Sequence, residues 1–91
     1  MKELERILKA LANKRRLAII KYLKQEKEAT VGDIAEKIKL SFKATSKHLG
    51  ILAVVDIVEK EQRSLQVWYR LSPQLHHVAK YVSQHISNSL E

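Results

Sequence analysis

The sequence predicts a mainly α-helical fold that carries one small β-hairpin. Apolar residues recur with a helical period along most of the 91 residues, whereas a short segment after residue 64 alternates apolar and polar side chains. Only two glycines and one proline interrupt the chain, which is typical of helices joined by short connections. We therefore expect one small domain over residues 1–91, with about five helices and a two-stranded hairpin.

The first two predicted helices are amphipathic. The first is expected over about residues 2–12, and Asn13 is expected to cap the second. Arg16 shares the apolar face of the second helix, so we expect it to make a structural ion pair or hydrogen bond. The apolar positions are Leu4, Ile7, Leu8 and Leu11 in the first helix, and Ile19, Ile20 and Leu23 in the second.

Residues 30–52 have the pattern of two helices joined by a tight turn. Thr30 and Asp33 approximate a capping box at the start of the first helix. Ser41 follows a short connection and can cap the second helix. The apolar stripe of the first helix is Val31, Ile34, Ala35 and Ile38.

The helix that starts at Ser41 has two distinct faces. A core-like face contains Thr45, His48, Leu49 and Leu52, and the other contains Lys43, Ser46, Lys47 and Gly50. Side chains of the second face can reach phosphates and base edges. We expect Phe42 to pack against the neighbouring helix rather than to meet a thymine methyl, and His48 to be partly buried and hydrogen-bonded. The residues that we predict to bind DNA on this helix are Ser41, Phe42, Lys43, Thr45, Ser46, Lys47 and His48.

The charge distribution agrees with a polyanionic partner. The chain has 17 Lys and Arg against 10 Asp and Glu, a formal net charge of +7. Residues 37–47 contain four lysines and no acid, and the tail from Ser72 onward is almost neutral.

A strand pattern follows the second helix of this motif. Ile57 and Val58 are expected to begin one strand, the polar stretch 59–64 to connect, and residues 65–71 to form the second strand. A hairpin in this position completes a winged helix-turn-helix. Arg63 lies near the tip of the hairpin. It is expected either to contact a phosphate or the minor groove, or to belong to a solvated loop without a role in binding. The alternating apolar positions are Leu65, Val67, Tyr69 and Leu71.

A last helix is expected over about residues 73–89, with Pro73 in its first turn. It is apolar along one side and short of charges, which favours a subunit interface with the first helix. The residues that we predict at a dimer interface are Leu4, Leu8, Leu75, Val78, Val82 and Ile86.

Several classes of function are disfavoured by what the sequence lacks. There is no cysteine, and no apolar run approaches the roughly 18 residues of a membrane span. There is no glycine-rich phosphate loop and no paired carboxylates near a histidine. We therefore expect no enzyme activity, no cofactor and no membrane association, and a cytoplasmic location.

Four segments together resemble the ArsR-type winged-helix transcriptional repressors. They are Leu-Lys-Ala-Leu-Ala-Asn-Lys-Arg-Arg-Leu-Ala-Ile-Ile at 8–20, Ile-Ala-Glu-Lys-Ile-Lys-Leu-Ser at 34–41, Ser-Lys-His-Leu-Gly-Ile-Leu at 46–52 and Val-Trp-Tyr-Arg-Leu at 67–71. The resemblance implies that the helix from Ser41 is the recognition helix and that the hairpin is the wing. It also implies that the terminal helices form a homodimer on a palindromic operator in double-stranded DNA.

The chain departs from that family in places that concern its turns and its metal sites. Lys39 and Ser64 stand where the family usually has glycine, and no Cys-x-Cys pair lies near residues 29–33. The family's tail zinc ligands correspond to Gln74-x-His76 and His85-x-x-Asn88, of which the two amides are poor zinc ligands. We therefore expect no metal site.

Two other functions compete with a sequence-specific repressor. One is a winged helix used for protein–protein contact, and the run of lysines at 37–47 argues against it. The other is non-specific binding of nucleic acid, including RNA, which only a selection of bound sequences would separate from the first.

Overall fold

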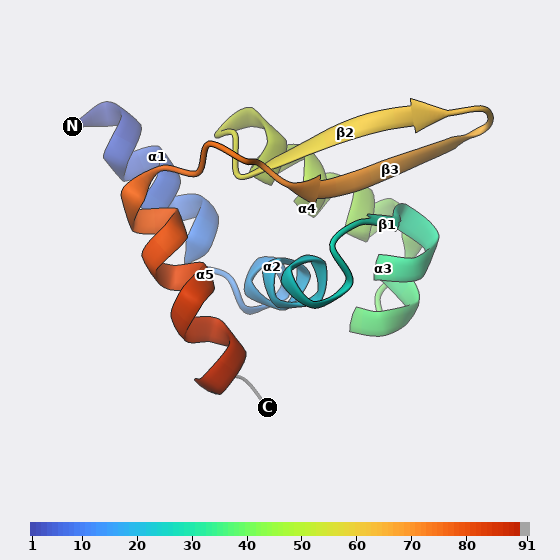
Figure 1. Cartoon of the computed structure of the whole chain (residues 1–91), viewed down its shortest axis with the longest axis horizontal. Helices are drawn as coiled ribbons and strands as arrows, with labels where there is room; N and C mark the ends of the chain where they lie inside the picture. Colours follow the sequence, from blue (N-terminus) through green and yellow to red (C-terminus); the bar gives the residue numbers. More distant parts are fainter. Residues whose placement is uncertain (90–91) are drawn as a thin grey trace.

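The computed structural model of the chain describes the backbone of residues 1–89 and the side chains of residues 1–86. Within these residues, five helices surround a small core, and a three-stranded antiparallel sheet extends from one side (Figure 1). The predicted winged helix-turn-helix is confirmed. The helices are α1 Lys2–Leu11, α2 Lys14–Glu26, α3 Val31–Ile38, α4 Phe42–Val54 and α5 His77–Ser89, and the strands are β1 Ala29–Thr30, β2 Val58–Arg63 and β3 Gln66–Leu71.

The three predicted N-caps of the central helices are confirmed. Asn13 Oδ1 accepts the backbone N–H groups of Arg15 at 2.9 Å and Arg16 at 3.1 Å. Thr30 Oγ1 accepts the N–H of Asp33 at 3.2 Å, and Ser41 Oγ accepts that of Ala44 at 3.1 Å. Each cap satisfies N–H groups that a helix leaves without partners, so it fixes where the helix begins.

The turn between α3 and α4 closes without a glycine. Lys39 adopts a left-handed conformation with φ of 58°, and its N–H bonds to the Glu36 carbonyl at 3.3 Å. The N–H of Leu40 donates to the Ala35 carbonyl at 3.0 Å, which completes a Schellman-type end for α3. A lysine costs on the order of 1 kcal/mol in this conformation, and the two hydrogen bonds offset that cost.

The sheet differs from the predicted two-stranded hairpin. Its strand order is β1-β3-β2, because Ala29 and Thr30 pair with Tyr69 and Trp68. The polar stretch 59–64, which we expected to be a connection, forms most of β2, so the turn is shorter and lies at Ser64 and Leu65. Leu65 is 95% exposed there, so its expected place on the apolar stripe is wrong.

Helix α2 is the centre of the fold. It contacts all four other helices and β3, and Ile19, Ile20 and Leu23 on it are almost fully buried. α1 and α5 lie side by side at one end, and the wing extends from the other (Figure 1). This arrangement leaves α4 at the surface, and its buried face contains Thr45, Leu49 and Leu52.

The last helix begins at His77, four residues later than Pro73, which we had expected in its first turn. His76 Nδ1 accepts the N–H of Val78 at 3.2 Å, so this imidazole acts as a cap. Ile86 is 3% exposed and belongs to the chain's own core. Its predicted place in a dimer interface is therefore wrong, because it needs no partner chain to be buried.

Thr45 is a second residue whose predicted role is wrong. We expected a DNA contact, yet its side chain is 0% exposed and points into the core with Leu49 and Leu52. The Oγ1 atom has no hydrogen-bond partner among the described residues. A buried hydroxyl without a partner costs free energy relative to a methyl group of the same shape.

We therefore expect Thr45→Val to raise the free energy of unfolding by about 1 kcal/mol. Thr45→Ala, which removes the methyl group as well, is expected to lower it because it leaves a cavity. Urea denaturation at one fixed protein concentration measures both variants. A loss of stability in Thr45→Val would show that the hydroxyl has a partner in solution.

Candidate nucleic-acid interface

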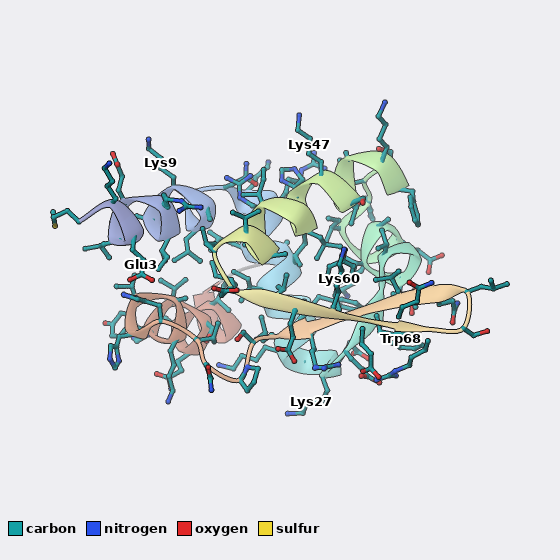
Figure 2. All side chains as sticks on the ribbon, turned by 90° about the horizontal axis from the view of Figure 1, so that it is seen from above. Glu3, Lys9, Lys27, Lys47, Lys60 and Trp68 are labelled. Atoms are coloured by element: carbon teal, nitrogen blue, oxygen red, sulfur yellow. The ribbon has the colours of Figure 1, made fainter. Side chains whose placement is uncertain are left out.

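The exposed face of α4 presents a row of short polar and cationic side chains. Lys43, Lys47 and Gly50 are exposed and Ser46 is half-buried, so the face predicted from the helical period is the one that meets solvent. Lys47 points directly away from the body of the protein, on the same side as Lys9 of α1 (Figure 2). The role of these residues in DNA binding remains a prediction.

Phe42 does not pack as we had expected. It is 63% exposed at the first position of α4, beside the cap Ser41. An exposed aromatic ring at the start of this helix is available for an apolar contact such as a thymine methyl. The structure therefore favours a contact of this kind over packing against the neighbouring helix.

Arg16 ties α4 to two other helices. Its Nε donates to the Ala10 carbonyl at 2.6 Å and its Nη2 to the Lys9 carbonyl at 3.1 Å, at the C-terminal end of α1. Its Nη1 lies 3.2 Å from His48 Nδ1 on α4. Because arginine can only donate, His48 accepts through an unprotonated Nδ1. The structural role predicted for Arg16, and the partly buried and hydrogen-bonded state predicted for His48, are both confirmed.

His48 therefore sits in a cationic environment. Burial lowers the pKa of His48, because the charged form loses hydration. The nearby charges of Arg16, Arg15 and Lys47 lower this pKa further. A neutral imidazole at ordinary pH is the state in which the bond to Arg16 can form.

The outer face of the wing is internally neutralised. Arg63 makes two hydrogen bonds to the carboxylate of Glu28, at 2.7 and 2.8 Å, and a third to Glu61 at 3.1 Å. Its guanidinium carbon also lies 5.1 Å from the centre of the Trp68 ring. Hydrogen bonds from Arg63 lower the pKa of Glu28, so this carboxylate stays charged.

This arrangement bears on the predicted contact of Arg63 with DNA. Both terminal nitrogens are held by carboxylates, so a phosphate would compete with these ion pairs, and the contact of Arg63 with DNA remains a prediction. Arg70 is held in the same way by Glu59 at 2.7 Å and Glu61 at 2.9 Å. No local sequence signal indicated Glu28, which lies 35 residues before Arg63.

Cations near α4 are not neutralised in this manner. The ion pairs found among the described side chains lie on α1 or on the wing and Glu28. None of them involves Lys43, Lys47 or Arg15. The two arginines of the wing are therefore paired with carboxylates, whereas Lys43 and Lys47 of α4, like Lys60 of the wing, take part in none of these ion pairs.

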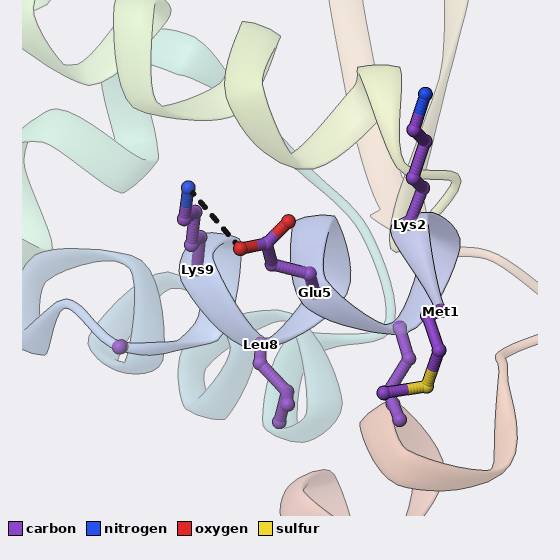
Figure 3. A pocket seen from close by; sticks show the side chains of 7 residues that line it. Met1, Lys2, Glu5, Leu8 and Lys9 are labelled. Carbon is purple, nitrogen blue, oxygen red and sulfur yellow. Dashed lines mark ion pairs between the residues drawn. The ribbon is translucent and has the colours of Figure 1, made fainter.

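A shallow apolar groove of about 550 Å³ runs along α1 at the other end of the molecule. Leu8 is 48% exposed and Met1 99% exposed, and both point to one side of α1 (Figure 3). The Glu5–Lys9 ion pair lies on the other side of the helix at 3.7 Å. Of the residues predicted at a dimer interface, Leu8 is exposed, and Leu4, Leu75, Val78 and Val82 are half-buried.

Two further features bear on the expected absences. Among the residues with described side chains, no three His, Asp or Glu groups come close enough to hold a metal ion. The side chain of Asn88, which occupies one of the resembled zinc positions, lies outside the described residues. Within residues 1–89, every helix is too short or too polar to cross a bilayer.

Comparison with known proteins identifies the family. Residues 13–60, more than half of the chain, match the model of a family described as "Bacterial regulatory protein, arsR family". The chain belongs to the ArsR family. The resemblance stated from four sequence segments is thereby confirmed, and membership of a regulatory family agrees with the expectation that the protein is not an enzyme.

Several known proteins are similar to this ArsR-family chain. The transcriptional activator HlyU of Vibrio cholerae is 38% identical over 66 residues, which are 72% of this chain and 60% of HlyU. The solved structure of V. cholerae HlyU has a TM-score of 0.81 at 30% identity, and the match covers 98% of this chain and 95% of that chain. The chain thus spans 60% of this relative in the sequence match and nearly all of it in the structural match.

Two other solved structures extend the comparison. The homodimeric winged helix-turn-helix DNA-binding domain from Mycobacterium bovis gives a TM-score of 0.78 at 28% identity, covering 94% of this chain and 73% of that chain. The transcriptional repressor BigR from Xylella fastidiosa gives a TM-score of 0.75 at 30% identity, and the match covers 92% of this chain and 80% of BigR. These proteins share the fold of this chain, including the order of helices and wing.

The lowered pKa of His48 predicts a pH-dependent stability. Its pKa in the folded state lies below the ordinary value of 6.5, so near and below that value the unfolded chain binds more protons. The contribution of neutral His48 to the free energy of unfolding is complete above pH 6.5. It decreases as the pH falls toward the pKa of His48 in the folded state. We expect His48→Gln to flatten the change in the free energy of unfolding between about pH 5 and pH 7, above the range where carboxylates titrate.

The measurement is urea denaturation of wild type and variant at a series of pH values. The other histidines are common to both proteins, so the difference between the two curves isolates His48. An unchanged pH dependence in His48→Gln would contradict the assignment of a neutral, buried His48.

Proposed function

We propose that this ArsR-family protein is a sequence-specific DNA-binding transcriptional repressor that acts as a homodimer on a palindromic operator. In this proposal α4 enters the major groove, and the two copies of α4 reach half-sites whose centres are roughly 34 Å apart. Bound protein would exclude RNA polymerase from the promoter. The proposal is supported by the fold, by the charge around α4 and by the relatives described above.

The single observation that carries the proposal is the exposed face of α4. It combines two cations without ion-pair partners among the described residues, a small serine and an exposed aromatic ring. These groups can contact phosphates, base edges and a thymine methyl respectively. A helix that served only for protein contact would be expected to present a more apolar centre.

The homodimer is supported by the ends of the chain. The groove along α1 lies beside α5, whose side chains are partly apolar and nearly free of charge. A small domain that exposes such a surface gains stability when a second copy covers it. A two-fold dimer also matches the symmetry of a palindromic site. The homodimeric relative from Mycobacterium bovis has this same fold.

The first test concerns Lys43 and Lys47. We expect Lys43→Ala with Lys47→Ala to weaken binding to a selected operator. The logarithm of the affinity falls linearly with the logarithm of the salt concentration, and each lysine that contacts a phosphate adds about 1 to the steepness of that line. The double variant should therefore have a shallower slope than the wild type. A lysine that touches a base would instead relax specificity by about 1–3 kcal/mol at one position when it is replaced. Fluorescence anisotropy at several salt concentrations measures both effects.

The matched control for this test is a comparison of two single variants. Lys47→Ala and Lys27→Ala remove the same charge, but Lys27 points to the side of the molecule opposite Lys47 (Figure 2). Lys27→Ala is expected to leave operator affinity nearly unchanged. If Lys47→Ala binds the operator as well as Lys27→Ala does, the assignment of α4 is wrong.

The second test concerns the dimer. We expect Leu8→Glu to shift the chain toward monomer, because a carboxylate placed in an interface loses hydration without gaining a partner. Leu65→Glu is the control, since Leu65 is 95% exposed at the wing tip, far from α1. Sedimentation at tens of micromolar measures both. A monomeric wild type, or equal effects of the two substitutions, would rule out this interface.

A further inference from the structure

A second cleft, distinct from the α1 groove and from the exposed face of α4, opens between α2 and α3. Its volume is about 630 Å³, within the range of small-molecule sites. It is lined by Lys14, Arg15, Ala18, Lys21, Tyr22 and Gln25 of α2 and by Lys37 and Ile38 of α3. Half of the lining residues are cations, and none is an acid.

The positive charge of this cleft is not an average property of the surface. On the wing, two arginines are each paired with two carboxylates. In the cleft, no ion pair of Lys14, Arg15 or Lys37 is found among the described side chains. Converging cations repel one another, and an anion bound among them relieves that repulsion. The cleft is therefore complementary to negative charge.

Two of the four cations that line the cleft lie in the first turn of α2. Lys14 and Arg15 are the first two residues of that helix, and the helix N-terminus itself favours a negative charge. Burial raises the pKa of Tyr22, and the charges of Glu26, Asp33 and Glu36 raise it further, but none of these three acids lines the cleft. An anionic group is thus best placed beside Lys14 and Arg15.

The remaining walls indicate what else the ligand carries. Ala18, Ile38 and the Tyr22 ring are half-buried and form an apolar section next to the cations. A phosphate of a DNA backbone would use the cations but not this apolar section. A ligand that uses both parts has one anionic group and a flat or compact apolar body.

We propose that the cleft between α2 and α3 binds a small organic anion, such as an aromatic phosphate or carboxylate. The anionic group lies between the lysines and the arginine, and the apolar body rests on Ala18, Ile38 and Tyr22. Arg16 follows Arg15 in the same turn and contacts His48 on α4, so the ligand lies one residue from the contact that holds the recognition helix. Binding of the anion does not depend on the proposed DNA function and is tested without DNA.

The test uses phenyl phosphate as the probe and the intact chain labelled with ¹⁵N. We expect saturable shifts of amide resonances in α2 and α3. Inorganic phosphate is expected to bind about tenfold more weakly, because it leaves the apolar section uncovered. Benzyl alcohol, which has the ring but no charge, is expected to produce no saturable shift.

The decisive variants are two charge-matched pairs. Arg15→Gln with Lys37→Gln removes two cations from the cleft and is expected to weaken phenyl phosphate about tenfold. Lys27→Gln with Lys80→Gln removes two exposed cations that do not line it, and is expected to retain the wild-type affinity. Thermal unfolding of each variant without probe shows that the chain is folded.

Three results would overturn the proposal. The first is the absence of saturable shifts in α2 and α3. The second is equal weakening in the two variant pairs, which would show a general effect of charge. The third is equal affinity for phosphate and phenyl phosphate.

If phenyl phosphate does not bind, but the cleft variant pair lowers operator affinity more than the control pair does, the cleft contacts phosphates of the DNA backbone instead. That last result would leave the proposed DNA function intact.

Discussion

The position of α4 depends on the hydrogen bonds of one side chain, Arg16. The last carbonyl groups of a helix have no partners within it, and Arg16 supplies donors to two of them at the end of α1. Its third contact reaches His48 on α4. Arg16 can do this because Asn13 caps α2 and fixes the start of the helix three residues earlier. α1 and α4 are thus joined through Arg16 of α2, and a lysine could not replace the fork of donors that an arginine provides.

The distribution of charge follows from how the acids are used. Three glutamates, Glu28, Glu59 and Glu61, hold the two wing arginines on the outer face of the sheet. These pairs are partly exposed and are worth little as stability. Their consequence is electrostatic, because they neutralise these two arginines, and among the cations of the wing only Lys60 lies outside the ion pairs of the described side chains. The net charge of +7 is carried mainly by α2, which has five cations and one acid, and by α4, which has two lysines and no acid. The proposed DNA face lies on α4, and α2 supplies three of the four cations of the α2–α3 cleft.

β2 forms where the sequence favoured a loop, and the same ion pairs connect its side chains to neighbouring strands. Residues 58–63 are mostly polar, and their intrinsic strand preference is weak. In the sheet, Glu59 lies opposite Arg70, and Glu61 lies opposite Trp68 and bonds to Arg70. Cross-strand pairs of opposite charge favour this register only modestly, and β2 is held mainly by its backbone pairing with β3 over six residue pairs. The turn that remains uses Ser64 with φ of 58°, a conformation that glycine adopts more readily.

The sequence by itself determined the features that depend on local periodicity and on short-range hydrogen bonds. These are the helix-turn-helix, its caps at Thr30 and Ser41, the exposed lysines of α4 and the family. Tertiary structure alone decided the pairing of β1 with β3, the contact of Glu28 with Arg63 and the cleft between α2 and α3. It also decided that Ile86 is buried within its own chain, whereas helical spacing had already placed Thr45 on a core-like face. The physical reason is that contacts between residues far apart in the chain are set by how whole elements pack, and no local pattern records which faces will meet.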